Sequence, residues 1–241
     1  MKKQKFPKVT KNKLARFAEM KTFPNVVEPE FREVFYKDYR LKGKWQKDFF
    51  KNDKPIVLEL GCGKGEYTIN LARQYPNHNF IGIDIKGARM WRGAKIALEE
   101  NIPNAVFLRT RIDFITSFFE EDEVKAIWVT FPDPQPKKPR KRLISTKFLT
   151  YYQHFIQNNS PIHLKTDNYN LYHYTLSIIR ENELYLLYAE NDIYGVNNNQ
   201  LEAIRKIQTF YEKQFLEENK KIKYVAFKLD KYKNLKEPPD D

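Results

Sequence analysis

Three glycines, Gly61, Gly63 and Gly65, follow a short apolar run at residues 56–60. Because glycine has no Cβ atom, it adopts positive φ angles readily and lets the backbone approach a ligand closely. The spacing G-x-G-x-G differs from the G-x-G-x-x-G of dinucleotide-binding turns and from the phosphate-binding G-x-x-x-x-G-K-[ST]. The turn therefore predicts a pocket for a ligand with a ribose but no pyrophosphate. A purely structural tight turn is the alternative.

Two acidic residues flank this turn. Glu59 lies in the apolar run before the glycines, and Asp84 ends the next apolar run. An acid at the carboxyl end of the neighbouring parallel strand can accept hydrogen bonds from both hydroxyls of a ribose. A buried carboxylate such as Glu59 needs a partner, and an ammonium group would serve. S-adenosylmethionine carries a ribose, an ammonium and a sulfonium, so we expect it to be the cofactor.

A second acidic loop combines prolines, one aspartate and a run of cations. Residues 131–142 read FPDPQPKKPRKR, and the prolines restrict the backbone on both sides of Asp133. We expect Asp133 to lie at the carboxyl edge of the sheet, where its oxygens can accept the N1–H and N2–H of a guanine. The cations that follow can contact phosphates; they are Lys137, Lys138, Arg140, Lys141 and Arg142. A solvated loop whose charges only aid solubility is the alternative.

A third acid, Asp167, ends the segment HLKTD at residues 163–167. It is expected at the same edge of the sheet. Two interpretations stay open at this point: Asp167 contributes to binding, or it is the N-cap of the helix that follows.

The net charge of +12 comes mainly from two segments. Residues 1–22 hold seven lysines and Arg16 against Glu19, and residues 137–147 hold six cations and no acid. Clustered cations gain free energy from counterion release at phosphates, so the pattern predicts a polyanionic partner. A general excess of lysine is the alternative, but it does not account for the clustering.

Composition excludes several classes of protein. With 241 residues, 41% hydrophobic and 15% aromatic, the chain can bury the core of one full domain and is not globally disordered. No apolar run approaches the ~18 residues of a membrane span. Cys62 is the single cysteine and the four histidines lack ligand spacing, so neither an intrachain disulfide nor a metal site is predicted. We expect a soluble, cytoplasmic protein without membrane contact; monomer and homodimer both remain open.

From residue 55, short β-branched runs alternate with helical spacing, which predicts a mostly parallel α/β sheet covered on both faces. The expected strands are 56–60, 80–85, 106–108, 126–131, 162–165, 184–189 and 224–229. The expected helices are 67–74, 89–100, 147–157, 169–180 and 201–218. A strand directly after the last helix predicts an antiparallel final pair. We expect a basic arm and irregular lead-in at 1–50, the main domain at 51–230 and a frayed tail at 231–241.

In chain order, these motifs resemble those of the bacterial tRNA (guanine-N7)-methyltransferases. The resemblance rests on LELGCGKG at 58–65, GID at 82–84, FPDPQPKK at 131–138, HLKTD at 163–167 and TFYE at 209–212, and covers about residues 55–229. It implies a Rossmann-like, doubly wound, seven-stranded sheet that binds S-adenosylmethionine and methylates a guanine in the variable loop of tRNA.

The resemblance also implies roles for individual residues. Cofactor contacts are implied for Glu59, Gly61, Gly63, Gly65, Asp84, Arg111 and Asp133, and Asp133 is the implied catalytic acid. Substrate contacts are implied for Lys137, Asp167, Thr209, Phe210, Tyr211 and Glu212. Three features depart from the family pattern: Gln135 replaces a usual Trp, the basic run is about two residues shorter, and Arg111 replaces an acid or amide. Because arginine accepts no hydrogen bond, it cannot bind an adenine amino group as that acid or amide does.

Other functions fit the residues less well. The segment at residues 132–134 has some likeness to the [DNS]-P-P-[YFW] loop of methyltransferases that act on exocyclic amines, but it lacks the second adjacent proline and the aromatic residue. A non-catalytic RNA-binding protein on the same fold would not need the intact glycines and acids. A nicotinamide dehydrogenase disagrees with the glycine spacing.

Overall fold

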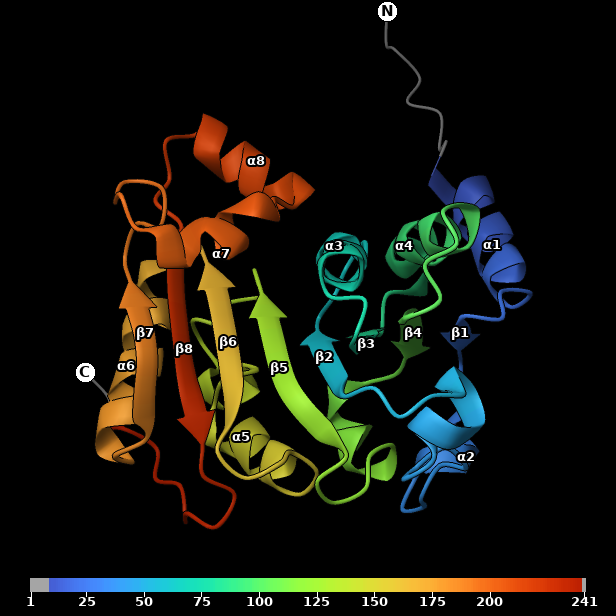
Figure 1. Ribbon diagram of the computed structural model, residues 1–241, viewed down its shortest axis with the longest axis horizontal. Coiled ribbons are helices and arrows are strands. Elements are labelled where there is room, and N and C mark those ends of the chain that lie inside the picture. The colour runs from blue at the N-terminus through green and yellow to red at the C-terminus, as the bar shows by residue number, and fades with distance from the viewer. Residues whose placement is uncertain (1–8, 240–241) are drawn as a thin grey trace, which may run out of the picture.

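The structure, a computed structural model, describes residues 9–239, and within them the strands form one eight-stranded sheet (Figure 1). The spatial order is β1-β4-β3-β2-β5-β6-β8-β7. The strands are β1 (Val26–Val27), β2 (Ile56–Leu60), β3 (Asn79–Asp84), β4 (Ala105–Arg109), β5 (Val124–Thr130), β6 (Ser160–Thr166), β7 (Tyr185–Glu190) and β8 (Lys223–Leu229). The strands from β1 to β6 pair in parallel, and β8 runs antiparallel to both β6 and β7.

The order of strands creates a switch point at β2. The chain continues from β2 to β3 on one side and later places β5 on the other side of β2. In open parallel sheets, ligands bind outside the carboxyl ends of the strands at such a point. The glycine turn after β2 lies there.

Helices cover both faces of the sheet (Figure 1). They are α1 (Val9–Met20), α2 (Phe31–Val34), α3 (Glu66–Gln74), α4 (Gly87–Glu99), α5 (Thr146–Gln153), α6 (Tyr169–Glu181), α7 (Glu202–Lys206) and α8 (Phe210–Glu217). One hydrophobic cluster includes side chains of α1, α3 and α4, and the other includes side chains of α5 and α6. Successive side chains of a strand point to opposite faces, so Val57 joins the first cluster and Leu58 the second.

Short helical turns complete the chain: a π-helix at Trp45–Phe50 and 3₁₀ turns at Ile112–Ser117, Pro139–Lys141 and Asn199–Leu201. Trp45 is fully buried and donates its indole N–H to the carbonyl of Phe118 at 2.8 Å. Within residues 9–239, no helix is long and apolar enough to cross a membrane.

The sequence predictions of the seven longer strands are confirmed, and the sheet contains one strand more than predicted. The additional strand is β1, which pairs with β4 through only two residues. Residues 9–20 form α1 where an irregular lead-in was expected. Met20 is fully buried, and Glu19 accepts a hydrogen bond from Trp91 and pairs with Lys95 at 2.9 Å. The first eight residues of the predicted basic arm lie outside the described residues.

Two further expectations differ from the structure. The helix predicted at 201–218 is divided into α7 and α8, because Ile207 adopts an extended conformation and Thr209 starts a new helix as its N-cap. The expectation of a frayed tail does not hold for residues 231–239. There, Glu237 accepts hydrogen bonds from Thr146 and Tyr174, and Leu235 packs against the core.

Candidate active site

A pocket of about 570 Å³ opens at the carboxyl ends of β2, β3, β5 and β6. This volume is in the range of small-molecule sites. The predicted residues that line it are Glu59, Gly61, Gly63, Asp84, Asp133, Lys141, Asp167, Thr209 and Tyr211. The structure therefore brings together side chains that lie up to 152 positions apart in the sequence.

The glycine turn forms the floor of this pocket. Gly61, Gly63 and Gly65 all have positive φ angles, of 76°, 56° and 72°. A Cβ atom on Gly61 or Gly63 would meet no described protein atom closer than 3.5 Å, so both positions leave room for a ligand. Gly65 does not line the pocket; it starts α3 and packs against the ring of Phe107. Its role is to shape the turn.

Asp84 is fixed by two backbone donors. Its Oδ2 accepts the N–H of Gly63 at 3.0 Å, and its Oδ1 accepts the N–H of Lys86 at 2.8 Å. The carboxylate lines both the main pocket and an adjoining cavity of about 360 Å³. An acid held in this way at the end of β3 can accept hydrogen bonds from a ribose diol.

The adjoining cavity is lined in part by Ile85, Ile112 and Leu143, which suit a flat apolar ring. Arg111 also lines it, and its guanidinium pairs with Asp113 at 3.4 Å. The structure thus places Arg111 beside the predicted cofactor site but not in the main pocket.

Glu59 is almost completely buried, with 3% of its surface exposed. Its Oε2 accepts hydrogen bonds from the backbone N–H and the hydroxyl of Thr68, and its Oε1 accepts the hydroxyl of Thr130 at 2.6 Å. Burial raises the pKa of Glu59 to about 7, although the hydrogen bonds from Thr130 and Thr68 lower it. A cationic ligand group would therefore stabilise the ionised form of Glu59.

The loop that carries Asp133 has strained backbone on both sides of the acid. Phe131 and Gln135 both have a φ of +46°, a region that non-glycine residues rarely adopt and that is frequent at functional sites. Oδ1 of Asp133 accepts the N–H of Gln135 at 3.0 Å, which closes a turn around the exposed carboxylate. Gln135, where the family usually has Trp, lines the main pocket and the adjoining cavity.

The five cations of the basic loop do not share one environment. Lys141 is exposed and lines both cavities. Lys137, Lys138 and Arg140 are exposed outside the main pocket. Arg142 is partly buried: it donates to the carbonyl of Pro134 at 3.0 Å, and its guanidinium lies 4.2 Å from the ring centre of Tyr174. Arg142 therefore supports the loop through its Nε–H and the face of its guanidinium, and a phosphate contact would use its other N–H groups.

The structure excludes one of the two interpretations of residue 167, and the binding role stays a prediction. Asn168, not Asp167, is the N-cap of α6, because its side chain accepts the N–H of Leu171 at 2.8 Å. The side chain of Asp167 has no capping role, and the residue lines the main pocket.

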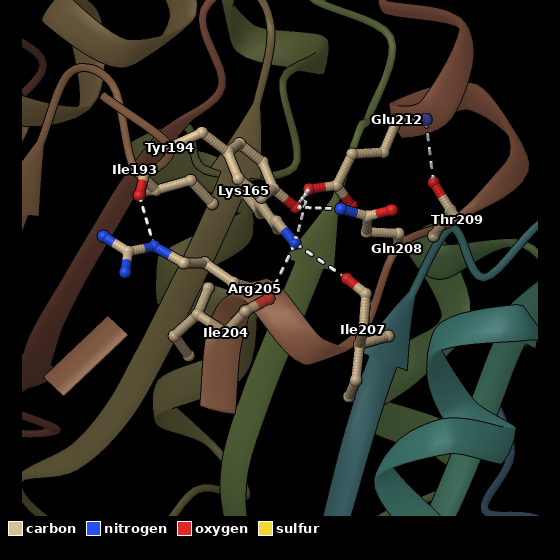
Figure 2. A network of polar contacts seen from close by, with 9 residues as sticks. All are labelled: Lys165, Ile193, Tyr194, Ile204, Arg205, Ile207, Gln208, Thr209 and Glu212. Carbon is tan, nitrogen blue, oxygen red and sulfur yellow. Dashed lines mark hydrogen bonds and ion pairs between the residues drawn. The ribbon is translucent and has the colours of Figure 1, made fainter. Parts of the chain in front are cut away.

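The predicted substrate segment at residues 209–212 is divided between pocket and core. Thr209 and Tyr211 line the pocket. The ammonium of Lys64 lies 3.5 Å from the ring centre of Phe210. The backbone N–H of Phe210 donates to the carboxylate of Glu66 at 2.9 Å. Glu212 is fully buried outside the pocket and pairs with Lys165 at 2.7 Å (Figure 2). The structure does not bring Glu212 to the substrate side.

Sequence reasoning missed several residues of the site. Thr68 and Thr130 bind Glu59, and Lys64 and Glu66 connect the glycine turn to α8. Thr130 directly precedes the proline-rich loop at a strand end, and that position was an available signal. Thr68 carries no such signal, since only the contact with Glu59 identifies it.

These residues fit S-adenosylmethionine. The glycines provide room for backbone contacts, Asp84 can accept ribose hydroxyls, and Glu59 is a buried carboxylate that a ligand ammonium would stabilise. Among residues 9–239, no group of three or more His, Cys, Asp or Glu side chains is arranged to hold a metal ion.

The G-x-G-x-G turn, the fixed Asp84 and the buried Glu59 at the switch point of a largely parallel sheet are the arrangement expected of an S-adenosylmethionine-dependent methyltransferase. Dinucleotide-binding sheets use the spacing G-x-G-x-x-G instead. Residues 53–225 match the family model described as "Putative methyltransferase". The tRNA (guanine-N(7)-)-methyltransferase of Christiangramia forsetii is 51% identical over 222 residues, which cover 91% of this chain and 99% of that protein. The protein of the same name from Bacteroides fragilis is 48% identical over 228 residues, covering 95% and 90%. The chain belongs to the tRNA (guanine-N(7)-)-methyltransferase family.

Solved structures share the fold at much lower identity. The 16S rRNA methyltransferase KamB has a TM-score of 0.57 and 14% identity, covering 73% of this chain and 88% of that chain. A 30S ribosomal A1408 methyltransferase from an uncultured bacterium has a TM-score of 0.54 and 16% identity, covering 76% and 91%.

Proposed function

We propose that this chain transfers the methyl group of S-adenosylmethionine to N7 of a guanine in the variable loop of tRNA, and that it does so in the cytoplasm. The observation that carries the proposal is that Asp133 lines the same pocket as Gly61, Gly63 and Asp84. The residues proposed to bind the cofactor and the exposed acid of the stiff loop therefore line the same pocket. The named relatives support the choice of base and atom.

The reaction makes few demands on proton transfer. N7 of guanine carries a lone pair in the plane of the ring, and no proton leaves N7 when a bond to carbon forms. The protein therefore needs no strong general base, and its task is to hold the reactants in line, which can lower the barrier by about 7–11 kcal/mol. Bound S-adenosylmethionine supplies an electrophilic methyl group next to a positive sulfur.

The residues of the pocket have separate tasks in this scheme. Asp84 binds the ribose side of the cofactor and Glu59 its ammonium. Asp133 accepts N1–H and N2–H of the guanine, which orients the base and stabilises the positive charge that develops on it. Thr209, Tyr211 and Asp167 complete the wall of the substrate side. The exposed Lys137, Lys138, Arg140 and Lys141 contact phosphates near the target base.

The test is to incubate the protein with labelled S-adenosylmethionine and unmodified tRNA, digest the RNA and identify the methylated nucleoside by mass spectrometry. We expect 7-methylguanosine, located in the variable loop by chain cleavage specific to that nucleoside. A product methylated on an exocyclic amine would place the chain in another substrate class, and the lack of both cofactor binding and product would support a non-catalytic RNA-binding protein.

A further inference from the structure

Lys165 is a fully buried lysine near the end of β6 that the proposed mechanism does not use. It lies opposite Thr130 in the pairing of β5 with β6. Its backbone carbonyl accepts the N–H of Phe131 at 2.8 Å. Because Phe131 begins the loop that carries Asp133, this hydrogen bond fixes the first residue of that loop to the backbone of Lys165.

The side chain of Lys165 holds a different part of the pocket wall (Figure 2). Its ammonium donates to the carbonyls of Ile204 and Ile207, both at 2.9 Å, and pairs with Oε1 of Glu212 at 2.7 Å. An ammonium has three donors, so all of its hydrogen-bonding capacity is used. The two carbonyls lie in and just after α7, and Glu212 lies in the first turn of α8.

The segment between these attachments faces the pocket. Residues 207–211 connect α7 to α8, and Thr209 and Tyr211 within it line the cavity. On the far side of the pocket, the same segment contacts the glycine turn through Phe210, which meets Lys64 and Glu66. Lys165 is therefore joined to both walls of the substrate side, one through its backbone and one through its side chain.

The pair is costly for the fold, which argues that its geometry matters. Burial lowers the pKa of Lys165 and raises that of Glu212, while their mutual attraction opposes both shifts. Oε1 of Glu212 also accepts the hydroxyl of Tyr194 at 2.8 Å, whereas Oε2 is buried with no hydrogen-bond partner among the described residues. Well-packed apolar residues often stabilise a fold as well as a buried ion pair does, so stability alone does not explain the pair.

We propose that Lys165 is a positioning residue that fixes the segment 207–211 relative to the Asp133 loop, and that Glu212 acts through Lys165 rather than by touching the substrate. The inference rests on the proposed function for its consequence in catalysis. It assigns a role to Lys165 and changes the role expected for Glu212. With the pair intact, Thr209 and Tyr211 hold the target base at a fixed distance from Asp133.

The decisive variant removes both charges at once. In Lys165→Met/Glu212→Leu, no unpaired charge is left in the core, but the carbonyls of Ile204 and Ile207 lose their donor. We therefore expect Tm to fall by about 4–12 °C, and kcat is measured well below it. Cofactor affinity, measured by calorimetry, should be unchanged. The kcat with saturating tRNA should fall at least about tenfold, since small misplacements of reactants cost up to 10²-fold. Amide hydrogen exchange without substrate should become faster at residues 202–217.

Lys231→Met is the matched control. Lys231 is also shielded, with 5% of its side chain exposed, and pairs with Glu121 and Asp122, which do not line the pocket. This variant should keep kcat and the exchange of residues 202–217 at parental values.

Two results of the activity and binding assays would overturn the inference: parental kcat in the double variant, or loss of cofactor binding in parallel with activity. Unchanged exchange at residues 202–217 would do the same even if the parent transfers no methyl group to tRNA. Failure of the proposed function is thus recognised separately, in the parent protein.

Discussion

Gly63 donates its backbone N–H to Oδ2 of Asp84 at 3.0 Å, so the turn after β2 and the acid at the end of β3 form one unit. The same carboxylate also accepts the N–H of Lys86. Two backbone donors fix the orientation of Asp84 before any ligand arrives. The acid therefore presents its remaining acceptor positions to the pocket at little further entropic cost.

Replacing Asp84 should weaken cofactor binding. For Asp84→Ala we expect the Kd of S-adenosylmethionine to rise by about 10- to 100-fold, because hydrogen bonds to a charged group contribute about 1.5–3 kcal/mol. Calorimetric titration measures the change. Asp38→Ala is the control, since Asp38 pairs with Lys42 on the surface and lies outside the pocket. An unchanged Kd in Asp84→Ala would contradict the assignment.

Replacing Asp133 should affect turnover and not cofactor binding. In Asp133→Asn one carboxylate oxygen becomes an amide donor, which cannot accept a guanine N–H. We expect kcat to fall by about 100-fold, as for the loss of a preorganised charge-stabilising group, with the Kd of the cofactor unchanged. Single-turnover methylation together with calorimetry separates the two effects. Normal turnover would remove Asp133 from the mechanism.

The pH dependence of stability should reveal Glu59. Because the folded state raises the pKa of Glu59 to about 7, it holds the proton more tightly than the unfolded chain does. The contribution to the free energy of unfolding is fully present below about pH 4.5 and is lost as the pH rises through 7; it is on the order of 3 kcal/mol. Without cofactor, Glu59→Gln should therefore be more stable than the parent at pH 8 and similar to it at pH 4.5.

Urea denaturation at both pH values measures this difference. Cofactor binding should also release a proton near pH 7, because a ligand ammonium favours ionised Glu59. Calorimetry in buffers of different ionisation enthalpy detects the release. Equal pH profiles for the parent and Glu59→Gln would show that Glu59 titrates in its ordinary range.

The two basic segments should affect different kinetic parameters: the N-terminal segment the affinity for tRNA, and the loop at residues 137–142 also kcat. Residues 1–8 hold four lysines and precede α1, so their deletion leaves the buried Met20 in place. We expect this deletion to weaken tRNA binding and to reduce its salt dependence, with kcat retained. Lys141→Ala, which alters a pocket-lining cation, should lower kcat as well. The assay is methylation kinetics at several salt concentrations, and the opposite pattern would refute the division.

Much of the fold could be predicted from the sequence because the patterns that indicate its strands and turns are local. The apolar runs of the longer strands and the glycines after β2 follow from period and turn chemistry within a few residues. Strand β1 has only two residues, between Pro24 and Pro29, and no pattern of that length indicates a strand. Its existence depends on pairing with β4.

The details of the site depended on contacts between distant residues. Asp167 and Asn168 are both good N-cap residues, and only the side-chain geometry assigns the cap to Asn168. At the break between α7 and α8, the carbonyls of Ile204 and Ile207 accept hydrogen bonds from Lys165, about 40 positions earlier in the chain. The helical spacing at residues 201–218 does not indicate this contact with Lys165.

The folded C-terminal segment has a practical consequence. Glu237 accepts the hydroxyl of Tyr174, the ring of Tyr174 lies against Arg142, and Arg142 binds the carbonyl of Pro134, which is adjacent to Asp133. A truncation that removes Glu237 would take away the first support in this series. A C-terminal truncation at or before Glu237 should therefore disturb the Asp133 loop, although Glu237 itself does not line the main pocket.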